Sequence, residues 1–450
     1  MKESRYNIWV DVDDATYLYN GMTGALLRLS NGDREAVARV LADPTETRCS
    51  PKLLEQMAHG RMLVPEDADE IDLLAKRYEL TRFDTTHFAY TLVTSLGCNF
   101  DCPYCFEAKH PSIMSADVQD AILAALDDQL PRINSFTVTW FGGEPLVGKQ
   151  PLLALSDAFI ERCDANEVHY SATITTNGYL LDVETCRQLR DRRVEAVQVC
   201  LDGPPEVHDK MRPLVNGKGT FWRIVKNLHH AVEHLSVTIR MNVDALNILR
   251  TEELLQILES EGLSGKVGVY PGQIVGVDDG NGSPSSSYGT PCMTNPEYAA
   301  AEIEFNELVS RYGFGAPSLP RPSSAPCTAV RKNELVVGSE GELYKCWDSV
   351  GNKLEVIGSI FDYANPNGRM QKWIKYDPFT DEECRGCVAL PTCMGGCAHH
   401  GMDLIQHENR CSTFRHNYRE QVVQFVHHAE RSGEAAAVAP SGLVRRMDTR

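Results

Sequence analysis

The chain has 450 residues, and its 44 basic and 62 acidic residues give a net charge of −18 at pH 7. An acidic chain argues against nucleic-acid binding, because that affinity depends on clustered lysine and arginine. No apolar run reaches the about 18 residues of a membrane-spanning helix, and the first residues lack the apolar core of a signal peptide. Fifteen cysteines in such a chain indicate metal binding in a reducing cytoplasm rather than disulfide bonds.

Residues 1–85 are predicted to form a separate small unit. Two β-prone runs at 6–12 and 15–19 are joined by Asp13-Asp14, which indicates a hairpin. The sequence then predicts three helices and one short strand, in chain order at 33–41, 51–58, 61–64 (the strand) and 70–79. Two or three strands with three helices resemble the winged-helix-like module with which peptide-modifying enzymes hold a leader peptide. The alternative is an N-terminal extension that only packs on the next domain.

From residue 86 to about 274, strands and helices alternate. β-branched apolar runs predict strands at 89–95, 135–141, 169–175, 196–201, 237–243 and 266–270. Helical windows lie between them, at 115–129, 152–164, 182–192, 220–234 and 249–261. This alternation predicts an α/β fold with a parallel sheet whose function lies at the carboxyl ends of the strands. Six strands rather than eight predict an open, partial (β/α)6 TIM-like barrel.

The remaining third of the chain divides into three parts. Residues 275–325 are expected to be a linker with one bridging helix, because 275–291 is rich in Gly, Ser and Pro and 296–312 has a helical pattern. Residues 326–425 form a cysteine-dense domain, and 426–450 are expected to be a disordered tail.

A triplet of cysteines directly follows the first barrel strand. Cys98, Cys102 and Cys105 have the spacing C-x3-C-x2-C. Three thiolates this close can hold three irons of a [4Fe–4S] cluster, whereas a complete protein set takes four cysteines. The fourth iron is then open to another ligand, and an exchangeable position is where chemistry takes place. The alternatives are a chance grouping or a structural zinc site that lacks one ligand.

Polar turns end the next four strands. They contain Gly142-Gly143-Glu144-Pro145, Thr176-Asn177, Asp202 and Arg240-Met241-Asn242. Glycines allow a ligand to approach the backbone, and carbonyl and carboxylate groups suit an ammonium group. Each turn taken alone is also compatible with an ordinary strand-to-helix connection. Four of them behind one cysteine triplet predict a single binding site.

Together these motifs resemble those of radical S-adenosylmethionine (SAM) enzymes. The resemblance implies that the triplet holds a [4Fe–4S] cluster whose open iron is chelated by SAM. It also implies that Tyr104 contacts adenine and that Gly142-Gly143-Glu144-Pro145 binds the methionine amino group. The implied reaction is reductive cleavage of SAM to a 5′-deoxyadenosyl radical, which takes a hydrogen from the substrate, with the chemistry supplied by the cofactors.

Further cofactor-binding residues are carried over from the resemblance. Cys200 stands where relatives commonly have a serine near SAM, so that contact is in doubt. Arg212 and Arg240 are both candidates for pairing with the SAM carboxylate, and Tyr270 is a candidate at adenine or a core residue. The remaining cofactor-binding candidates are Thr176, Asn177, Asp202 and Asn242. For the catalytic acid or base, the weak candidates are Asp202, His208 and Asp209.

A second cysteine group occupies the C-terminal third and consists of Cys327, Cys346, Cys384, Cys387, Cys393, Cys397 and Cys411. Seven thiolates over about 85 residues suit two clusters that share chain-distant ligands. A zinc ribbon is the alternative, but zinc takes four ligands and leaves three cysteines unused. The spacing resembles the SPASM extension of radical SAM peptide and protein maturases.

The SPASM resemblance implies how the ligands are shared between two auxiliary clusters. Cys384, Cys387, Cys393 and Cys411 would hold an outer cluster, and Cys327, Cys346 and Cys397 an inner one nearer SAM. The inner set lacks a fourth ligand, which is either Cys292 or a position left open. The other cysteines (Cys49, Cys163, Cys186 and Cys200) are expected to be buried apolar side chains. His399, His400 and His407 are expected to be core or solvated residues rather than ligands.

By resemblance, the leading hypothesis is a cytoplasmic maturase that forms a C–S, C–C or C–O crosslink in a ribosomally made precursor peptide. Residues 1–85 would bind the peptide's leader, and a reduced flavodoxin or ferredoxin would supply electrons. The first alternative is an anaerobic sulfatase maturase that forms formylglycine. The second is an electron carrier without enzymatic activity, and formation of 5′-deoxyadenosine from SAM discriminates against it.

Overall fold

The computed structural model describes residues 1–30, 32–43, 50–276, 283–288, 292–404 and 406–432, and the backbone of 442–445. Its largest sheet has nine strands in the order β11-β10-β9-β8-β7-β6-β12-β13-β14. The first six of these pair in parallel with their sequence neighbours. They are β6 (His87–Ser95), β7 (Ser135–Gly142), β8 (His169–Thr176), β9 (Val194–Cys200), β10 (Ser236–Val243) and β11 (Val267–Gln273).

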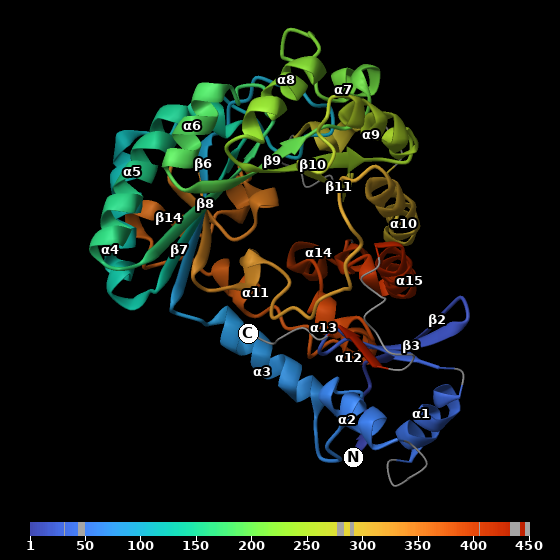
Figure 1. Cartoon of the computed structure of the whole chain (residues 1–450). Coiled ribbons are helices and arrows are strands. Elements are labelled where there is room, and N and C mark those ends of the chain that lie inside the picture. Colours follow the sequence, from blue (N-terminus) through green and yellow to red (C-terminus); the bar gives the residue numbers. More distant parts are fainter. Residues whose placement is uncertain are drawn as a thin grey trace.

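Helices cover the outer face of these six strands (Figure 1). They are α4 (Ala116–Gln129), α5 (Lys149–Ala165), α6 (Val183–Asp191), α7 (Pro205–Met211), α8 (Phe221–Ala231) and α9 (Thr251–Ser260). The expected α/β partial barrel is therefore confirmed, and each of the six predicted strands lies within three residues of its observed bounds at either end. The short helix α7 was not predicted, because it has only seven residues between two loops.

Aromatic side chains fill the layer between the sheet and α5. Phe136 on β7 and Tyr170 on β8 have ring centroids 5.8 Å apart, and Phe159 of α5 lies 5.1 Å from Phe136. All three are at most 1 % exposed. Such rings bury large apolar areas and hold helix and sheet in a fixed relation. The carboxyl ends of the strands, where the polar turns lie, are thereby held rigidly.

A four-stranded antiparallel sheet forms the N-terminal unit, in the order β15-β4-β3-β2. Its strands are β2 (Asn7–Val12), β3 (Ala15–Asn20), β4 (Ala25–Leu29) and β15 (Gly442–Arg445). β2 and β3 are joined by the predicted hairpin, whose residue Asp13 has φ +49°. The strand β4 was not predicted, and β15 comes from the other end of the chain. A separate two-stranded pair, β1 (Lys2–Glu3) and β5 (Leu63–Val64), lies beside it.

Three helices, α1 (Asp33–Ala42), α2 (Pro51–His59) and α3 (Glu70–Arg82), complete the first 85 residues. Of these, α3 packs on the rest of the molecule. Tyr78 donates its hydroxyl to the carbonyl of Tyr376 at 3.0 Å, and Arg82 Nε donates to the carbonyl of Val330 at 3.2 Å. Leu74 and Tyr78 belong to the same apolar core as the barrel strands. The first 85 residues therefore contribute α3, together with Tyr6 and Met22, to the main core.

The C-terminal third begins with α10 (Asn295–Arg311), whose N-terminus carries a capping box formed by Thr294 and Glu297. The strand β12 (Glu334–Val337) then pairs in parallel with β6, and β13 (Glu342–Tyr344) and β14 (Gly358–Ser359) extend the sheet in antiparallel fashion. Four short helices follow: α11 (Met370–Ile374), α12 (Glu382–Gly386), α13 (Leu390–Cys393) and α14 (Ala398–Met402). The cysteine-dense domain is therefore joined to the first barrel strand.

The last helix among the described residues is α15 (Phe414–Ser432), with non-helical backbone angles at Asn417. The sequence predicts disorder from 426, whereas the structure continues α15 to 432 and places 442–445 in β15, because the helix and strand find partners that are distant in sequence. The rest of the predicted tail lies outside the described residues. So does most of the Gly-Ser-Pro segment, in which 284–287 form one 3-10 turn. No described helix combines the length and the apolar character that crossing a membrane requires.

Candidate functional site

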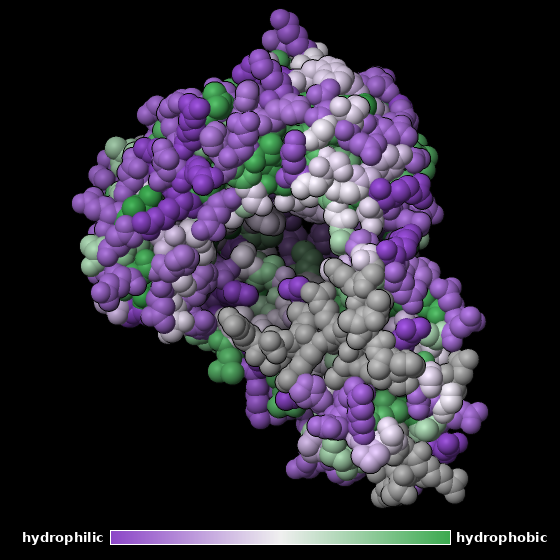
Figure 2. All heavy atoms as spheres, viewed as in Figure 1, coloured by the Kyte–Doolittle hydropathy of each residue, from purple (hydrophilic) through white to green (hydrophobic). Residues whose placement is uncertain are grey.

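A cavity of about 550 Å³ opens at the carboxyl ends of the barrel strands. Figure 2 shows the hollow between the barrel and the C-terminal third of the chain. Most of the residues that the sequence singled out line this cavity: Cys98, Cys102, Tyr104, Cys105, Gly142, Gly143, Glu144, Thr176, Asn177, Cys200, Arg212, Arg240, Asn242 and Tyr270. The polar turns of separate strands therefore meet at one site, as predicted from the parallel order of the strands.

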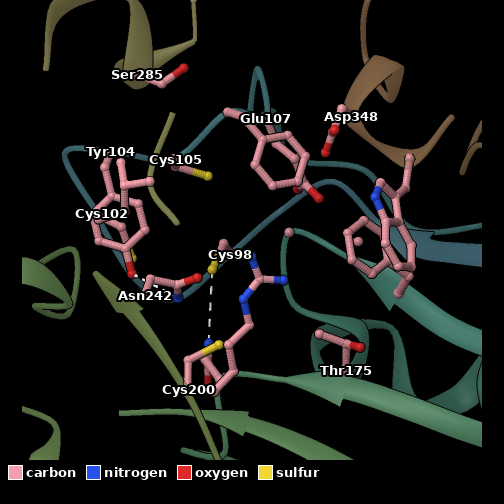
Figure 3. A pocket seen from close by; sticks show the side chains of 18 of the residues that line it. Cys98, Cys102, Tyr104, Cys105, Glu107, Thr175, Cys200, Asn242, Ser285 and Asp348 are labelled. Atoms are coloured by element: carbon pink, nitrogen blue, oxygen red, sulfur yellow. Dashed lines mark hydrogen bonds between the residues drawn. The ribbon is translucent and has the colours of Figure 1, made fainter. Parts of the chain in front are cut away.

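The three cysteines lie on the loop that leaves β6, and their thiols face the cavity (Figure 3). Burial raises the pKa of the Cys98 thiol to about 11 and that of Cys105 to about 12. Desolvated thiols of this kind lose their protons when a metal compensates the thiolate charge. Three such side chains on one wall fit a [4Fe–4S] cluster with one iron left for another ligand.

Two glycines at the end of β7 allow the cysteine loop to approach. Gly142 has φ +134°, and a Cβ there would lie 2.3 Å from the carbonyl oxygen of Ser95. A Cβ on Gly143 would lie 2.6 Å from the carbonyl oxygen of Leu96. Any side chain at either position would push the cysteine loop away from β7. The Gly-Gly pair is thus required by backbone contact as well as by access to a ligand.

The carboxylate of Glu144 is fully buried and accepts three hydrogen bonds. The donors are Thr176 Oγ1 at 2.6 Å, the backbone N–H of Asn177 at 2.7 Å and the backbone N–H of Leu146 at 3.0 Å. Burial raises the pKa of Glu144, against the lowering effect of these bonds. This side chain therefore ties the turn after β7 to the turn after β8. Pro145 begins the following 3-10 turn and is not among the residues that line the cavity.

Tyr104 belongs to a buried polar network on the opposite wall. Its hydroxyl donates to Asp202 and accepts from Arg212. Asp202 Oδ1 also accepts from the backbone N–H of Asn242 at 3.0 Å, and Arg212 lies 3.5 Å from Asp202. The network fixes the aromatic ring of Tyr104 relative to β9 and β10. Asp202 itself lies behind Tyr104 rather than on the cavity wall.

Arg240 differs from Arg212 in its surroundings. Arg212 is already engaged by Tyr104 and Asp202. Arg240 also lines the cavity. The Nε of both arginines is buried without a hydrogen-bond partner among the described residues, but only Arg212 uses its Nη1 to donate to Tyr104. Tyr270 lies beside it on β11, and its hydroxyl bonds to Gln198. A guanidinium with an unused donor is the arrangement that an anionic group of a ligand would satisfy.

Two of the weak catalytic candidates have structural roles instead. His208 Nδ1 accepts from the backbone N–H of Asp202 at 3.1 Å, and its Nε2 lies 3.0 Å from Thr220 Oγ1. Asp209 Oδ1 accepts the backbone N–H groups of Thr220 and Phe221, at the start of α8. Neither side chain lines the cavity. Both stabilise the loops behind the site.

Several lining residues were not expected from the sequence. Glu107 is 3 % exposed, and burial raises the pKa of its carboxyl to about 8. Asp348 and Trp347 reach the cavity from the C-terminal third, as do His399 and His400, which we had expected to be core or solvated. Of these residues, only Glu107 could have been suspected from the sequence, because it follows Cys105 by two positions. The others are more than 200 residues from the triplet, so no local pattern connects them to it.

Four of the distal cysteines share a second, small cavity: Cys384, Cys387, Cys393 and Cys411. This is the set expected for the outer cluster. Two arginines belong to the same cavity, and Arg415 Nη1 donates to Cys411 Sγ at 3.1 Å. Burial raises the pKa of Cys393 to about 12. Four thiols around one enclosed space, with cationic neighbours, fit a four-cysteine cluster site.

The other distal cysteines are Cys327, Cys346 and Cys397. Burial raises the pKa of Cys346 most, and Cys327 and Cys397 lie close enough to raise it further. His400 hydrogen-bonds to Cys397, which raises the pKa of the histidine. The contacts of Cys292 are elsewhere: a Cβ on Gly276 would lie 3.4 Å from its Sγ, and Asp244 is the nearby charge. The structure therefore brings three of the four expected inner ligands together and does not bring Cys292 to them.

Among the remaining cysteines, Cys163 and Cys186 are fully buried, as expected. Cys200 is 8 % exposed but also lines the main cavity. Cys49 lies outside the described residues.

Comparison with known proteins supports this picture. Residues 92–258 match the model of the Radical SAM superfamily. The chain is 30% identical over 166 residues to an Fe-coproporphyrin III synthase of Methanosarcina barkeri, covering 36% of this chain and 39% of the relative. It is 25% identical over 334 residues to a cysteine-type anaerobic sulfatase-maturating enzyme of Clostridium novyi, covering 67% of this chain and 85% of that enzyme. This chain matches less than two fifths of the length of the synthase and of two further curated relatives.

Two solved structures share the fold. One is native anSMEcpe with bound AdoMet and the Cp18Cys peptide, at a TM-score of 0.56 and 18% identity, covering 77% of this chain and 97% of that one. The other is Streptococcus suis SuiB bound to precursor peptide SuiA, at a TM-score of 0.50 and 13% identity, covering 92% of this chain and 99% of that one. The chain therefore carries a radical SAM domain, the domain of a superfamily of enzymes that use a [4Fe–4S] cluster and AdoMet.

Proposed function

We propose that this protein is a radical SAM maturase that abstracts a hydrogen from a ribosomally made precursor peptide and forms a C–S, C–C or C–O crosslink. The observation that carries the proposal is the shared cavity, in which three cysteines of one loop face Arg240, Asn177 and the aromatic Trp347 of the C-terminal third. When bound, the cluster and AdoMet supply a 5′-deoxyadenosyl radical. The cavity walls position AdoMet and limit access of water to it.

The residues that would hold AdoMet follow from their partners in the structure. Arg240 has a buried Nε without a partner among the described residues and suits the AdoMet carboxylate. Gly143 and Glu144 line the cavity next to the cysteine loop, and carbonyl or carboxylate groups suit the amino group. Tyr104, held by Asp202, presents a ring for adenine. Arg212 is less suited to the carboxylate, because Tyr104 and Asp202 already engage it.

The balance of the reaction requires an electron acceptor. Crosslinking removes two hydrogens from the peptide: one passes as a hydrogen atom to the deoxyadenosyl fragment, and the second leaves as a proton and an electron. Auxiliary clusters would accept this electron, and the residues that would hold them are Cys327, Cys346 and Cys397 for one and Cys384, Cys387, Cys393 and Cys411 for the other. A reduced flavodoxin or ferredoxin supplies the electron that cleaves AdoMet.

The N-terminal sheet is the proposed leader-binding element. At its β4 edge it already pairs with an extended segment of the chain, β15. Edge strands bind extended peptides through main-chain hydrogen bonds. In the solved structures, SuiB is bound to its precursor peptide SuiA and anSMEcpe to a peptide. The similarity to SuiB includes 92% of this chain, which supports a peptide-modifying role that uses the N-terminal unit.

The decisive test has two steps. Anaerobically reconstituted protein with dithionite and AdoMet should form 5′-deoxyadenosine, measured by liquid chromatography and mass spectrometry, and Cys98→Ala should not. The protein is then incubated with a library of randomised 12-residue peptides fused to candidate leader sequences. Some of these peptides should lose two hydrogens, as crosslinking requires. Deoxyadenosine formation without any peptide modification would contradict the maturase proposal and leave only the radical SAM chemistry.

A second candidate function is formylglycine formation, as in sulfatase maturation. The observation in its favour is the 25% identity to the Clostridium novyi sulfatase-maturating enzyme over 85% of that enzyme. A peptide containing Cys-X-Pro-X-Arg distinguishes the two functions. Conversion of its cysteine to formylglycine, detected with a hydrazide probe, favours the sulfatase-type reaction, and an intramolecular crosslink favours the maturase.

A further inference from the structure

One wall of the cavity carries two carboxylates that AdoMet binding, as proposed above, does not use. Glu107 lies on the loop after the cysteine triplet, and Asp348 lies on the 3-10 helix Trp347–Ser349 of the C-terminal third. Figure 3 shows the two side chains next to each other, on the side of the pocket away from Tyr104 and Asn242. They therefore lie where the cysteine-dense domain meets the barrel.

Glu107 has an unsatisfied oxygen. Its Oε2 is buried and has no hydrogen-bond partner among the described residues, and the side chain is only 3 % exposed. A buried carboxyl oxygen without a hydrogen-bond partner is unfavourable. Such a group persists at a binding site when a ligand supplies the missing donor. The carboxyl group of Asp348 nearby makes a cationic group the most favourable donor.

Among the described residues, none of the cations on the cavity wall donates a hydrogen bond to Oε2 of Glu107. Lys109 is a positive charge that acts on Glu107, but its ammonium donates to the backbone carbonyl of Phe100 at 2.9 Å. Arg212 is held by Tyr104 and Asp202 on the opposite wall. Arg240 lies beside Tyr270 on the strands β10 and β11. The missing donor for Oε2 of Glu107 is therefore expected to come with the substrate.

Aromatic rings next to the carboxylates indicate the shape of that cation. Trp347 stacks on Phe141 with ring centroids 5.7 Å apart and planes inclined by 21°. Trp347 is 44% exposed and Phe106 is 38% exposed, and all three rings line the cavity. Such surfaces cover an aliphatic stem and also attract a cationic head through the ring face. A long side chain with an apolar stem and a charged end fits both features.

We propose that Glu107 and Asp348 bind a lysine or arginine side chain of the substrate peptide, with Trp347 and Phe141 covering its aliphatic stem. The inference rests on the proposed peptide-modifying function and adds a substrate class to it. It places a basic residue of the peptide between the cysteine triplet and the cysteines of the C-terminal third. Glu107 is then a specificity-determining residue at the cavity wall.

The test uses the full chain with reconstituted clusters and saturating AdoMet, under anaerobic conditions. Isothermal titration calorimetry measures the binding of capped pentapeptides Gly-Gly-X-Gly-Gly, in which X is lysine, arginine, norleucine, glutamine or glutamate. The lysine and arginine peptides are expected to bind about tenfold more tightly than the norleucine peptide, the size expected for a hydrogen bond to a charged group. Glu107→Gln should remove most of this preference, Asp348→Asn part of it, and the exposed Glu161→Gln none.

Three results would overturn the inference. Equal affinities of the unmodified protein for the lysine and norleucine peptides would do so without reference to any variant, while leaving the maturase proposal intact. An increase of the AdoMet dissociation constant in Glu107→Gln, with peptide preference unchanged, would assign Glu107 to AdoMet instead. Failure of all five peptides to bind would count against the peptide substrate as well. Iron content and circular dichroism of each variant verify that it is folded.

Discussion

Single residues determine how closely the two loops of the candidate site approach each other. At Gly142 and Gly143, atoms of the cysteine loop lie where a side chain would begin. At Glu144, one carboxylate accepts hydrogen bonds from backbone N–H groups of two neighbouring turns. At Cys98 and Cys105, burial keeps thiols protonated until a metal binds. Each of these is a local chemical requirement that a conservative substitution can test.

Replacement of a triplet cysteine should remove one cluster and no other. Cys98→Ala is expected to lower the bound iron by about four atoms per chain, the content of one cubane. AdoMet cleavage should fall below detection, because three ligands are the minimum for the site. Iron analysis and 5′-deoxyadenosine measurement give the two readouts. The matched control is Cys186→Ala, a fully buried cysteine of α6, and equal iron loss in both variants would contradict the assignment.

Substitution of the buried carboxylate should cost stability. Glu144→Gln replaces an oxygen acceptor by an amide that donates, so at least one of its three donors loses its partner. An unsatisfied buried group costs about 1–3 kcal/mol. Differential scanning calorimetry should show a lower Tm for Glu144→Gln and an unchanged Tm for Glu161→Gln, whose side chain is exposed on α5. An unchanged Tm in Glu144→Gln would show that these hydrogen bonds carry no net stability.

At the scale of elements, the barrel places its site by repeating strand, turn and capped helix. Several helices begin at a side chain that accepts a backbone N–H: Ser115 before α4 and Asp182 before α6 are two cases. Such caps fix where each helix starts and therefore where the preceding loop ends. The loops that leave β6 and β8 at the cavity end therefore finish at these two caps. Stability of the caps is thus a requirement for the geometry of the site.

Removal of the α6 cap should lower stability in a pH-dependent way. The Asp182 carboxylate accepts the backbone N–H of Thr185 at 2.8 Å, and this bond lowers the pKa of Asp182 from its usual 3.8. Asp182→Ala is expected to lower the free energy of unfolding by about 1 kcal/mol at neutral pH. Because the folded-state pKa is lowered, the contribution is complete above pH 3.8 and is lost as the pH falls through the folded-state value.

Urea denaturation at pH 7 and pH 3 measures this effect. The difference between the natural protein and Asp182→Ala should shrink at the lower pH. Asp191→Ala, at the other end of α6, should show no loss at either pH, because a carboxylate there caps no free N–H group. A difference that stays constant with pH would contradict a role for the ionised carboxylate.

At the scale of the whole molecule, the two ends of the chain form one structure around the small sheet. One face of that sheet packs on α15: Ile8, Val10 and Val12 of β2 share a core with Val422, Phe425 and Val426. The other face packs on α1 and α2. Figure 1 shows this sheet and α15 below the barrel. Removal of residues 1–85 would therefore expose α15 and delete α3 from the main core, so point substitutions are better tests of this unit.

A core substitution in α15 should destabilise the N-terminal sheet. Phe425 is 7 % exposed, and Phe425→Ala is expected to cost about 3–5 kcal/mol. Limited proteolysis should then cleave β2 and β3 earlier than the barrel, followed by mass spectrometry of the fragments. Leu404→Ala is the control, because Leu404 is 97% exposed. Unchanged cleavage of the sheet in Phe425→Ala would contradict the packing of the two ends.

The sequence determined the barrel, because strand and helix periodicities are local and alternating strands and helices form a parallel sheet. It also determined the cysteine triplet and the polar turns, since residues that end parallel strands meet at one edge. Only the tertiary structure decided the partners that are distant in sequence. These are Glu107 beside Asp348, His399 and His400 on the cavity wall, α3 in the main core, β15 on β4, and Cys292 away from the other cysteines. Such contacts depend on which separate elements pack together, and the periodic pattern of one element does not show which distant element is its partner.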